Sequence, residues 1–242
     1  MVNPYKDLDK SKKDQVALMF NNIARKYDFL NHFLSMGIDK LWRKKAVKLL
    51  QSLQPKQLLD IATGTGDFAL ACLKLNPDKV TGIDISTEML AVGREKIAKK
   101  KLEDKIELFE GDSEDIQFED NSFDAITVAF GVRNFQNLEK GLKEMNRVVR
   151  PGGKVVILEF SKPKKFPVKQ FYNFYFFNIL PLWGKMVSKD SSAYTYLPES
   201  VGAFPDDENF LEIYKSCGFE DTEQVKLSFG IASIYIGTKP IQ

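Results

Sequence analysis

Four aspartates around a glycine-rich turn are the residues of this sequence whose types and spacing best suit ligand binding. Residues 64–69 read Gly-Thr-Gly-Asp-Phe-Ala, which fits the pattern G-x-G-x-x-G/A of a turn whose backbone approaches a nucleotide closely. Asp60 precedes this turn, Asp67 lies within it, and Asp84 and Asp112 each follow a further apolar run. Because ligands bind at the carboxyl ends of the strands in an open α/β sheet, we expect these acids to face one site.

The charge of the turn decides between two ligands. The pyrophosphate of a nicotinamide dinucleotide is held over a helix N-terminus, where N–H groups and the helix dipole favour negative charge. Asp60 and Asp67 would repel a pyrophosphate, but they suit the sulfonium and the amino group of S-adenosylmethionine. We therefore predict S-adenosylmethionine, with Asp84 accepting hydrogen bonds from the ribose hydroxyls. Asp112 is expected to bind the adenine amino group, beside the backbone N–H of Ser113, and a nicotinamide dinucleotide stays the alternative.

Strands and helices alternate around this turn. Helical spacing of apolar residues predicts helices over 12–34 and 41–53, and short apolar runs predict strands that lead into the acids. The predicted strands cover 58–62, 80–85, 106–109, 123–130, 155–160, 220–229 and 231–238, and the later helices cover 67–75, 86–97, 138–149 and 207–216. This order predicts an α/β fold with a Rossmann-like, doubly wound, seven-stranded and mostly parallel sheet that ends in an antiparallel hairpin.

The length of the chain favours a single domain over residues 1–242. We expect it to comprise N-terminal helices (1–55), a cofactor-binding core (56–160), an irregular, aromatic-rich insertion (161–205) and a C-terminal helix with the hairpin (206–242).

Composition argues against several other classes. The 35 basic and 33 acidic residues leave a net charge of +2, too little for a typical nucleic-acid-binding surface. Cys72 and Cys217 lie far apart without metal-ligand spacing, so we predict no metal site and a reducing compartment. No apolar run resembles a signal peptide or reaches the roughly 18 residues of a spanning helix. We expect a cytoplasmic protein that at most touches the inner face of a membrane.

Seven short segments identify the chain more closely. They read YDFLN (27–31), SMG (35–37), WR (42–43), AFGVRN (129–134), RPGG (150–153), LEFSKP (158–163) and YLPES (196–200). With them the sequence resembles the demethylmenaquinone/ubiquinone C-methyltransferase family, whose members are class I S-adenosylmethionine-dependent methyltransferases, over nearly its whole length. The family often has Gly where Thr63 stands and Ala where Ser113 stands, and both replacements are small.

The resemblance implies both the cofactor contacts and the reaction. By position it points to Thr65, Asp84, Asp112 and Ser113. The predicted cofactor-binding set is completed by Asp60, Gly64, Gly66 and Ala129. The implied reaction is methyl transfer to a ring carbon of a polyprenylated quinol, so the site should stabilise a developing phenolate.

Arg133 and Asn134 are the predicted catalytic residues, because they follow the fourth predicted strand, where the acceptor would meet the cofactor. The guanidinium of Arg133 stays charged at any working pH and suits a phenolate, while Asn134 can orient a quinol oxygen. The alternative is a structural arginine bonded to loop carbonyls. The residues considered as a general base are Tyr194, Tyr196, Asp190 and His32. None of them is singled out, and we expect water to accept the proton.

The stretch 171–183, FYNFYFFNILPLW, is uncharged and rich in rings. Lysines flank it at Lys164, Lys165, Lys169 and Lys185. It is too short to cross a bilayer, but an aromatic helix with a basic rim suits a membrane surface. Two interpretations stay open: a cover over the path of the prenyl tail that touches the membrane, or a helix simply packed over the sheet.

The favoured acceptor is demethylmenaquinol, which would place the reaction at the last step of menaquinone biosynthesis. The alternatives are 2-methoxy-6-polyprenyl-benzoquinol of ubiquinone biosynthesis, another small hydrophobic acceptor, or a non-catalytic scaffold that binds the cofactor. Enzymes that methylate amino groups of bases usually carry an Asp/Asn/Ser-Pro-Pro-aromatic motif after the fourth strand. Residues 130–134, FGVRN, stand there instead, which argues against a nucleic-acid acceptor.

Overall fold

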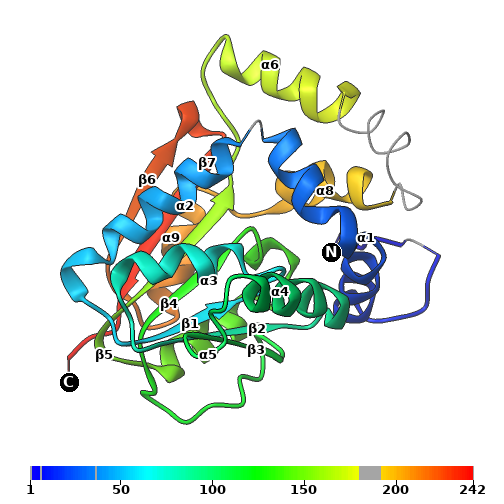
Figure 1. Cartoon of the computed structure of the whole chain (residues 1–242). Coiled ribbons are helices and arrows are strands. Elements are labelled where there is room, and N and C mark those ends of the chain that lie inside the picture. The colour runs from blue at the N-terminus through cyan, green and yellow to red at the C-terminus, as the bar shows by residue number, and fades with distance from the viewer. Residues whose placement is uncertain (1, 6, 36, 180–191, 242) are drawn as a thin grey trace.

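The computed structural model describes residues 2–5, 7–35, 37–179 and 192–241, which form a three-layered α/β arrangement (Figure 1). In this part of the chain one sheet has seven strands in the order β3-β2-β1-β4-β5-β7-β6. They are β1 (Gln57–Ile61), β2 (Lys79–Asp84), β3 (Ile106–Glu110), β4 (Phe123–Ala129), β5 (Val149–Phe160), β6 (Glu220–Leu227) and β7 (Ala232–Thr238). Strands β1 to β5 pair in parallel, and β7 runs antiparallel to both β5 and β6. The predicted fold class is confirmed.

Helices cover both faces of the sheet. On one face lie α2 (Ile38–Leu49), α3 (Asp67–Cys72) and α4 (Thr87–Lys99), and on the other lie α5 (Leu138–Val148) and α9 (Glu208–Ser216). The apolar side chains of each set pack with the alternate residues of the strands into a separate core, as expected when parallel strands are buried on both faces. Both cysteines are free and buried, one in each core.

A third group of helices lies over the carboxyl ends of the parallel strands. The long α1 (Lys12–Leu34) packs against α4 and against α8 (Ser192–Ala203). Next to them lie α6 (Val168–Phe174) and the π-helical turn η4 (Tyr175–Ile179). In the described parts of the chain, no helix is both long and apolar enough to cross a membrane.

Local sequence explains where the elements near the site begin. Ser86 precedes α4, and its Oγ accepts a hydrogen bond from the N–H of Met89 (3.3 Å), as an N-cap serine does. Gly66 precedes α3 with a φ of 79°, a left-handed conformation that glycine adopts without strain. The loops that follow β1 and β2 therefore turn sharply into helices at the same edge of the sheet.

Two predictions about the elements were wrong. β5 begins at Val149 rather than at residue 155, because the Pro-Gly-Gly segment that ends α5 stays in the sheet and pairs with β4 around an irregularity at Phe123 and Ala125. The insertion 161–205 is not irregular where it is described, since it contains α6, η4 and α8. Pro198 lies inside α8, and it hid the helical pattern. The end of the predicted aromatic segment, residues 180–183, lies outside the described residues.

Candidate active site

A pocket opens at the carboxyl ends of β1 to β4, beneath α1. Its volume is about 670 Å³, including the part that is open to solvent. Of the predicted residues it brings together Gly64, Asp84, Asp112, Ser113, Ala129 and Asn134. Asp60 and Thr65 line a smaller pocket beside it, which shares Gly64 and Ala129 with the first. Arg133 lines a third hollow, with Lys12 and Phe204.

Asp84 ends β2 and is fixed by backbone groups on both sides. Its Oδ2 accepts a hydrogen bond from the N–H of Gly64 (2.8 Å) and its Oδ1 from that of Ser86 (2.8 Å). Burial raises the pKa of Asp84 to about 6, although these bonds act in the opposite direction. A carboxylate offers about four acceptor positions, so Asp84 can still accept bonds from the hydroxyls of a ligand.

Asp60 lies beneath the glycine turn. Its carboxylate accepts hydrogen bonds from the hydroxyls of Thr63 (2.6 Å) and Thr127 (2.7 Å) and from the N–H of Ala69 (3.1 Å). Burial raises the pKa of Asp60 to about 6 against the effect of these bonds. Asp60 therefore ties β1 to β4 and to α3, and supports the turn from below.

The first helix closes over the turn through Asp28. The hydroxyl of Thr65 donates to Asp28 Oδ1 (2.5 Å), and Lys96 pairs with both Asp28 and Asp67 (2.7 Å each). Arg43 adds a second cation, 4.0 Å from Asp67 Oδ2. These contacts link α1, α3 and α4 at the edge of the pocket.

The premise that Asp60 and Asp67 present free negative charge to a ligand was wrong. Asp67 is compensated by Lys96 and Arg43, and the carboxylate of Asp60 is occupied by hydroxyl and N–H donors. The acids that line the main pocket are instead Asp84, Asp112 and Glu114, and the lining also includes one cation, Lys13, which pairs with Asp112.

Asp112 is covered by a lysine of α1. Lys13 Nζ binds Asp112 Oδ2 and lies 3.8 Å from Glu114, while Asp112 Oδ1 accepts a bond from the N–H of Glu114 (2.9 Å). Ser113 lines the pocket between them. The carboxylate predicted to bind an adenine amino group therefore already has a partner, the ammonium group of Lys13 on α1.

The glycine at the centre of the turn exposes backbone to the pocket. Gly64 has a φ of 56°, and a Cβ at this position would meet nothing within 4 Å. The position is thus open on the side of the pocket, and a side chain there would be strained and would occupy that space. Gly66 completes the turn, and Ala129 at the end of β4 lines both neighbouring pockets.

Arg133 lies in η3 (Val132–Asn134), directly after β4, and its side chain is buried. Its Nη1 donates to Glu159 Oε1 (2.8 Å) and to the carbonyl of Phe130, and the guanidinium lies 5.5 Å from the ring centre of Phe160. Glu159 is completely buried, and burial raises its pKa while the charge of Arg133 lowers it. The bond to the Phe130 carbonyl fits the alternative of a structural arginine. The guanidinium is also a buried cation that could stabilise a phenolate, and its catalytic role stays a prediction.

Asn134 turns toward the main pocket, which it lines. Its Nδ2 donates to the carbonyl of Phe130 (3.3 Å). Its Oδ1 is buried and has no hydrogen-bond partner in the described part of the protein. Arg133 and Asn134 therefore line two neighbouring hollows, which share the lining residues Phe135 and Gln136.

Of the residues considered as a general base, Tyr194 and Tyr196 are buried on α8. His32 lies on α1, in a stretch whose side chains are not described, and Asp190 lies outside the described residues.

Two important groups were missed from the sequence. Glu159 belongs to the LEFSKP segment and stands on the strand next to β4, which could have suggested a partner for Arg133. Lys12 donates to the carbonyls of Arg133 (3.1 Å) and Phe135 (2.8 Å), and burial together with the charge of Arg133 lowers its pKa to about 8. Nothing in the helical spacing of α1 indicated this contact.

Comparison with known proteins adds evidence that is independent of this geometry. A model of the ubiE/COQ5 methyltransferase family matches residues 8–239. A demethylmenaquinone methyltransferase from Bacteroides fragilis is 49% identical over 98% of this chain and 97% of its own. A ubiquinone/menaquinone biosynthesis C-methyltransferase UbiE from Geotalea daltonii is 46% identical over 94% of this chain and 97% of its own.

Solved structures share the fold at lower identity. A SAM-dependent methyltransferase from Thermotoga maritima, described as a possible histamine N-methyltransferase, has a TM-score of 0.63 and 20% sequence identity. The match covers 91% of this chain and 99% of that one. At such identity the likeness shows the fold alone.

Proposed function

This chain belongs to the ubiE/COQ5 methyltransferase family, which confirms the resemblance found in the sequence, and from that premise we propose that it methylates a ring carbon of demethylmenaquinol. The observation that carries the choice of acceptor is the 49% identity, over almost the whole of both chains, to a protein named demethylmenaquinone methyltransferase. In this proposal the reaction is the last step of menaquinone biosynthesis.

The main pocket fits S-adenosylmethionine as the methyl donor. Its apolar lining, with Phe20 and Met89, suits an adenine ring, and its acids Asp84 and Asp112 suit the ribose hydroxyls and the adenine amino group. The bare backbone at Gly64 leaves room for close approach. When bound, S-adenosylmethionine supplies an electrophilic methyl group.

The acceptor side of the site is the region around Arg133 and Asn134, where the quinol would meet the cofactor. The buried Arg133–Glu159 pair contributes a fixed positive group there. Glu159 balances part of the charge and holds the guanidinium through Nη1, so Arg133 needs no reorganisation when negative charge develops on the acceptor ring. Lys12 lies beside it and adds positive potential. In this proposal the buried Oδ1 of Asn134 accepts a hydrogen bond from a quinol hydroxyl.

The test is transfer of labelled methyl from S-adenosylmethionine into the organic phase. Purified protein is given short-chain demethylmenaquinol and, in parallel, the corresponding 2-methoxybenzoquinol, both kept reduced. We expect transfer to the naphthoquinol. Transfer to the benzoquinol as well would support a shared enzyme, which the name of the Geotalea daltonii relative favours as the second candidate function. No transfer to either, with binding of S-adenosylmethionine verified by calorimetry, would refute the acceptor.

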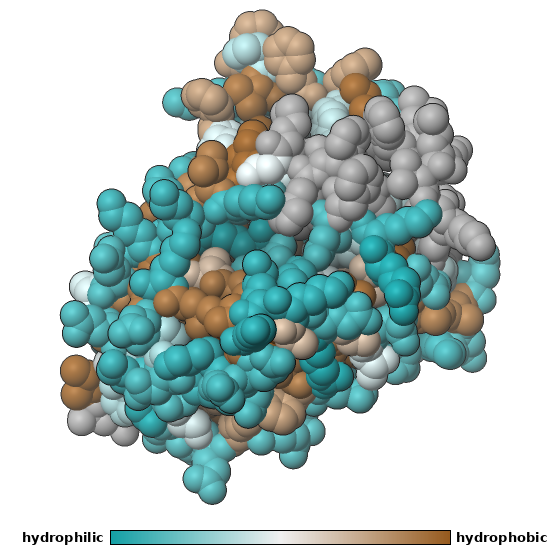
Figure 2. Space-filling model, in the orientation of Figure 1, coloured by the Kyte–Doolittle hydropathy of each residue, from teal (hydrophilic) through white to brown (hydrophobic). Residues whose placement is uncertain are grey.

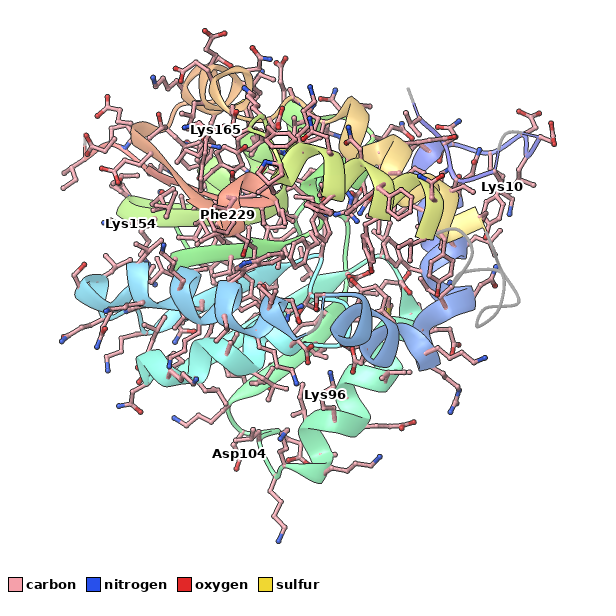
Figure 3. All side chains as sticks on the ribbon, turned by 90° about the horizontal axis from the view of Figure 1, so that it is seen from above. Lys10, Lys96, Asp104, Lys154, Lys165 and Phe229 are labelled. Carbon is pink, nitrogen blue, oxygen red and sulfur yellow. The ribbon has the colours of Figure 1, made fainter. Side chains whose placement is uncertain are left out.

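We further propose that the protein touches an anionic membrane surface through an aromatic patch. The patch consists of Phe166, Phe171, Phe174 and Phe229, whose exposed fractions lie between 59% and 85%. The segment before α6 and the turn between β6 and β7 are joined, since Ser161 Oγ donates to the carbonyl of Gly230 (2.9 Å). Figure 2 shows apolar atoms gathered over α6, and Figure 3 shows Phe229 and Lys165 on the same part of the molecule.

The chemistry of the patch favours a membrane as its partner. Lys165 and Lys169 are exposed beside the rings, and rings with a basic rim suit the headgroup region of anionic lipid. Phe176 does not belong to the patch, because it is buried against Tyr172 and Phe160. A prenylated substrate resides in the bilayer, so this contact would bring the site close to it.

A further inference from the structure

Four buried polar atoms on the acceptor side have no hydrogen-bond partner among the residues that the structure describes. They are Arg133 Nε, Asn134 Oδ1, Tyr172 Oη and Tyr196 Oη. The four side chains come from three segments, η3, α6 and α8. A buried polar group without a partner destabilises the folded state, and such groups are few in native proteins. A concentration of them in one region therefore indicates a ligand that would complete their bonding.

The two tyrosines are close enough to Arg133 to feel its charge. Burial raises the pKa of Tyr196 to about 12 and also raises the pKa of Tyr172, while the charge of Arg133 lowers both. The neighbouring Tyr175 provides a contrast, because its pKa is raised by burial alone. At any working pH both tyrosines keep their protons and can only serve as neutral hydrogen-bonding groups. This argues against Tyr196 as the general base.

Tyr196 stands behind the apolar wall of the main pocket, and a series of ring contacts connects Tyr172 to the same wall. Tyr196 packs with Val16, Phe20 and Ile85, all of which line the pocket. Tyr172 packs against Phe176, which contacts Phe160. Phe160 in turn stacks on Phe130 at a centroid distance of 4.5 Å, and Phe130 lines the pocket next to Asn134.

We propose that Tyr172, Tyr196 and Arg133 form a three-donor site for one oxygen of a hydroxylated aromatic ring. The Nε–H of Arg133 and the two phenolic hydroxyls donate to an oxygen that carries negative charge, and Asn134 Oδ1 accepts from a second ring hydroxyl. Three donors and one acceptor match a hydroquinone that has lost one proton. This inference rests on the proposed function and deepens it, because it assigns the group that recognises the acceptor's oxygens.

A site built to bond a substrate hydroxyl discriminates strongly against analogues without it, since its own buried groups are then left unpaired. The site should therefore prefer a hydroquinone over the matching ether. We would measure binding of 1,4-dihydroxynaphthalene and of 1,4-dimethoxynaphthalene by anaerobic calorimetry, with S-adenosylhomocysteine present. The variants are Tyr172→Phe and Tyr196→Phe, and Tyr175→Phe is the matched control from the same segment.

We expect each of the two variants to bind the hydroquinone about fivefold to tenfold more weakly, because each loses one hydrogen bond to it. Binding of the ether and of S-adenosylhomocysteine should be unchanged. The unfolding temperature should stay the same or rise, because neither hydroxyl has a hydrogen-bond partner among the residues that the structure describes. Tyr175→Phe should match the unaltered protein in hydroquinone binding. A purely structural role would instead lower the unfolding temperature.

Unchanged hydroquinone binding in both variants, or an equal loss in Tyr175→Phe, would overturn the three-donor site even if methyl transfer to a quinol is observed. Conversely, the expected losses together with no transfer to any quinol would support the site and refute the proposed function. The two proposals can therefore fail separately.

Discussion

The two sides of the candidate active site differ in how completely their polar groups are bonded. On the cofactor side, the carboxylates of Asp60 and Asp84 are fixed by hydroxyl and backbone donors within 3.1 Å. On the acceptor side, Asn134, Tyr172 and Tyr196 carry buried oxygen atoms without partners in the described part of the chain. From this comparison we propose that the polar groups of the cofactor side are bonded before any ligand binds, whereas the substrate completes the bonding of the acceptor side.

The difference has an electrostatic counterpart. The main pocket is lined by three acids, Asp84, Asp112 and Glu114, and by one cation, Lys13. This excess of negative charge suits a ligand with a positive charge and hydroxyl donors. The acceptor side is dominated by Arg133 and Lys12, with Glu159 as the buried counter-charge. A charge gradient of this kind suits a reaction between a cationic donor and an electron-rich ring.

The largest effect is expected from breaking the buried ion pair of the acceptor side. Glu159→Gln should lower the free energy of unfolding by about 3 kcal/mol, because it leaves the buried guanidinium of Arg133 without its counter-charge. Denaturant unfolding measures this. The control is Glu139→Gln, whose pair with Lys143 is exposed at 3.7 Å and should change the free energy by about 0.5 kcal/mol or less. Equal changes in the free energy of unfolding would show that the buried pair contributes no more to stability than the exposed one.

A somewhat smaller effect is expected on the cofactor side. Asp84→Ala should weaken binding of S-adenosylmethionine by about tenfold to a hundredfold, because the ribose hydroxyls lose their hydrogen bonds to a charged acceptor. Asp124→Ala is the matched control, because Asp124 also accepts two backbone N–H bonds, from Lys56 and Gln57 (2.8 Å each), but at the opposite end of the sheet. Calorimetry should show normal affinity in Asp124→Ala. A comparable loss of affinity in both variants would mean that Asp84 acts only through the fold.

The pH dependence of cofactor binding sharpens the same contrast. Burial raises the pKa of Asp84 to about 6, so a ligand that donates hydrogen bonds to the carboxylate prefers the ionised form, which predominates above pH 6. Affinity should therefore be full at neutral pH and fall by up to about tenfold per pH unit below 6. Asp84→Asn should flatten this dependence in calorimetric titrations between pH 5 and 8. Persistence of the full slope in that variant would assign it to another group.

The same raised pKa values affect stability with a definite sign. Asp60 and Asp84 bind protons more readily in the folded chain than in the unfolded chain, whose aspartates titrate near 3.9. Their contribution to stability is therefore fully present below about pH 4 and is lost as the pH rises through 6.

The smallest effect is expected at the aromatic patch, which lies outside the pocket. The double variant Phe171→Ser with Phe174→Ser should reduce partitioning onto vesicles of anionic phospholipid several-fold, because two exposed rings are removed from the contact. Vesicle co-sedimentation measures it. Transfer to a short-chain, water-soluble quinol should stay normal in this variant. Unchanged partitioning would refute the membrane contact.

The cofactor side could be predicted from the sequence because each of its residues follows a strand, and strand ends meet at one edge of the sheet. For that reason the sequence indicated that Asp84, Asp112 and Gly64 lie at one edge, where they line the main pocket, and their binding of the cofactor stays a prediction. Local pattern could not show that Asp60 lies under the turn, since the hydroxyl of Thr127 that binds it comes from a distant strand.

The acceptor side was less accessible to such reasoning. Arg133 was identified from the motif after β4, but its partner Glu159 belongs to the next strand, and pairing between strands is not visible in the spacing within either. Tyr172 and Tyr196 lie in a segment that was predicted to be irregular, because Pro198 and the clustered rings obscured its helices. The predictable part of the site is thus the part built by parallel strands, and the remainder depends on how helices from both ends of the chain close over it.

The most direct test of this account is a structure of the protein with S-adenosylhomocysteine and a reduced short-chain naphthoquinol bound together. The account predicts that the ribose hydroxyls bond to Asp84, and that one ring oxygen lies within hydrogen-bonding distance of Tyr172, Tyr196 and the Nε of Arg133. A quinol whose oxygens contact none of these three groups, while the adenosyl group occupies the main pocket, would contradict the proposed division between a prebuilt cofactor side and a substrate-completed acceptor side.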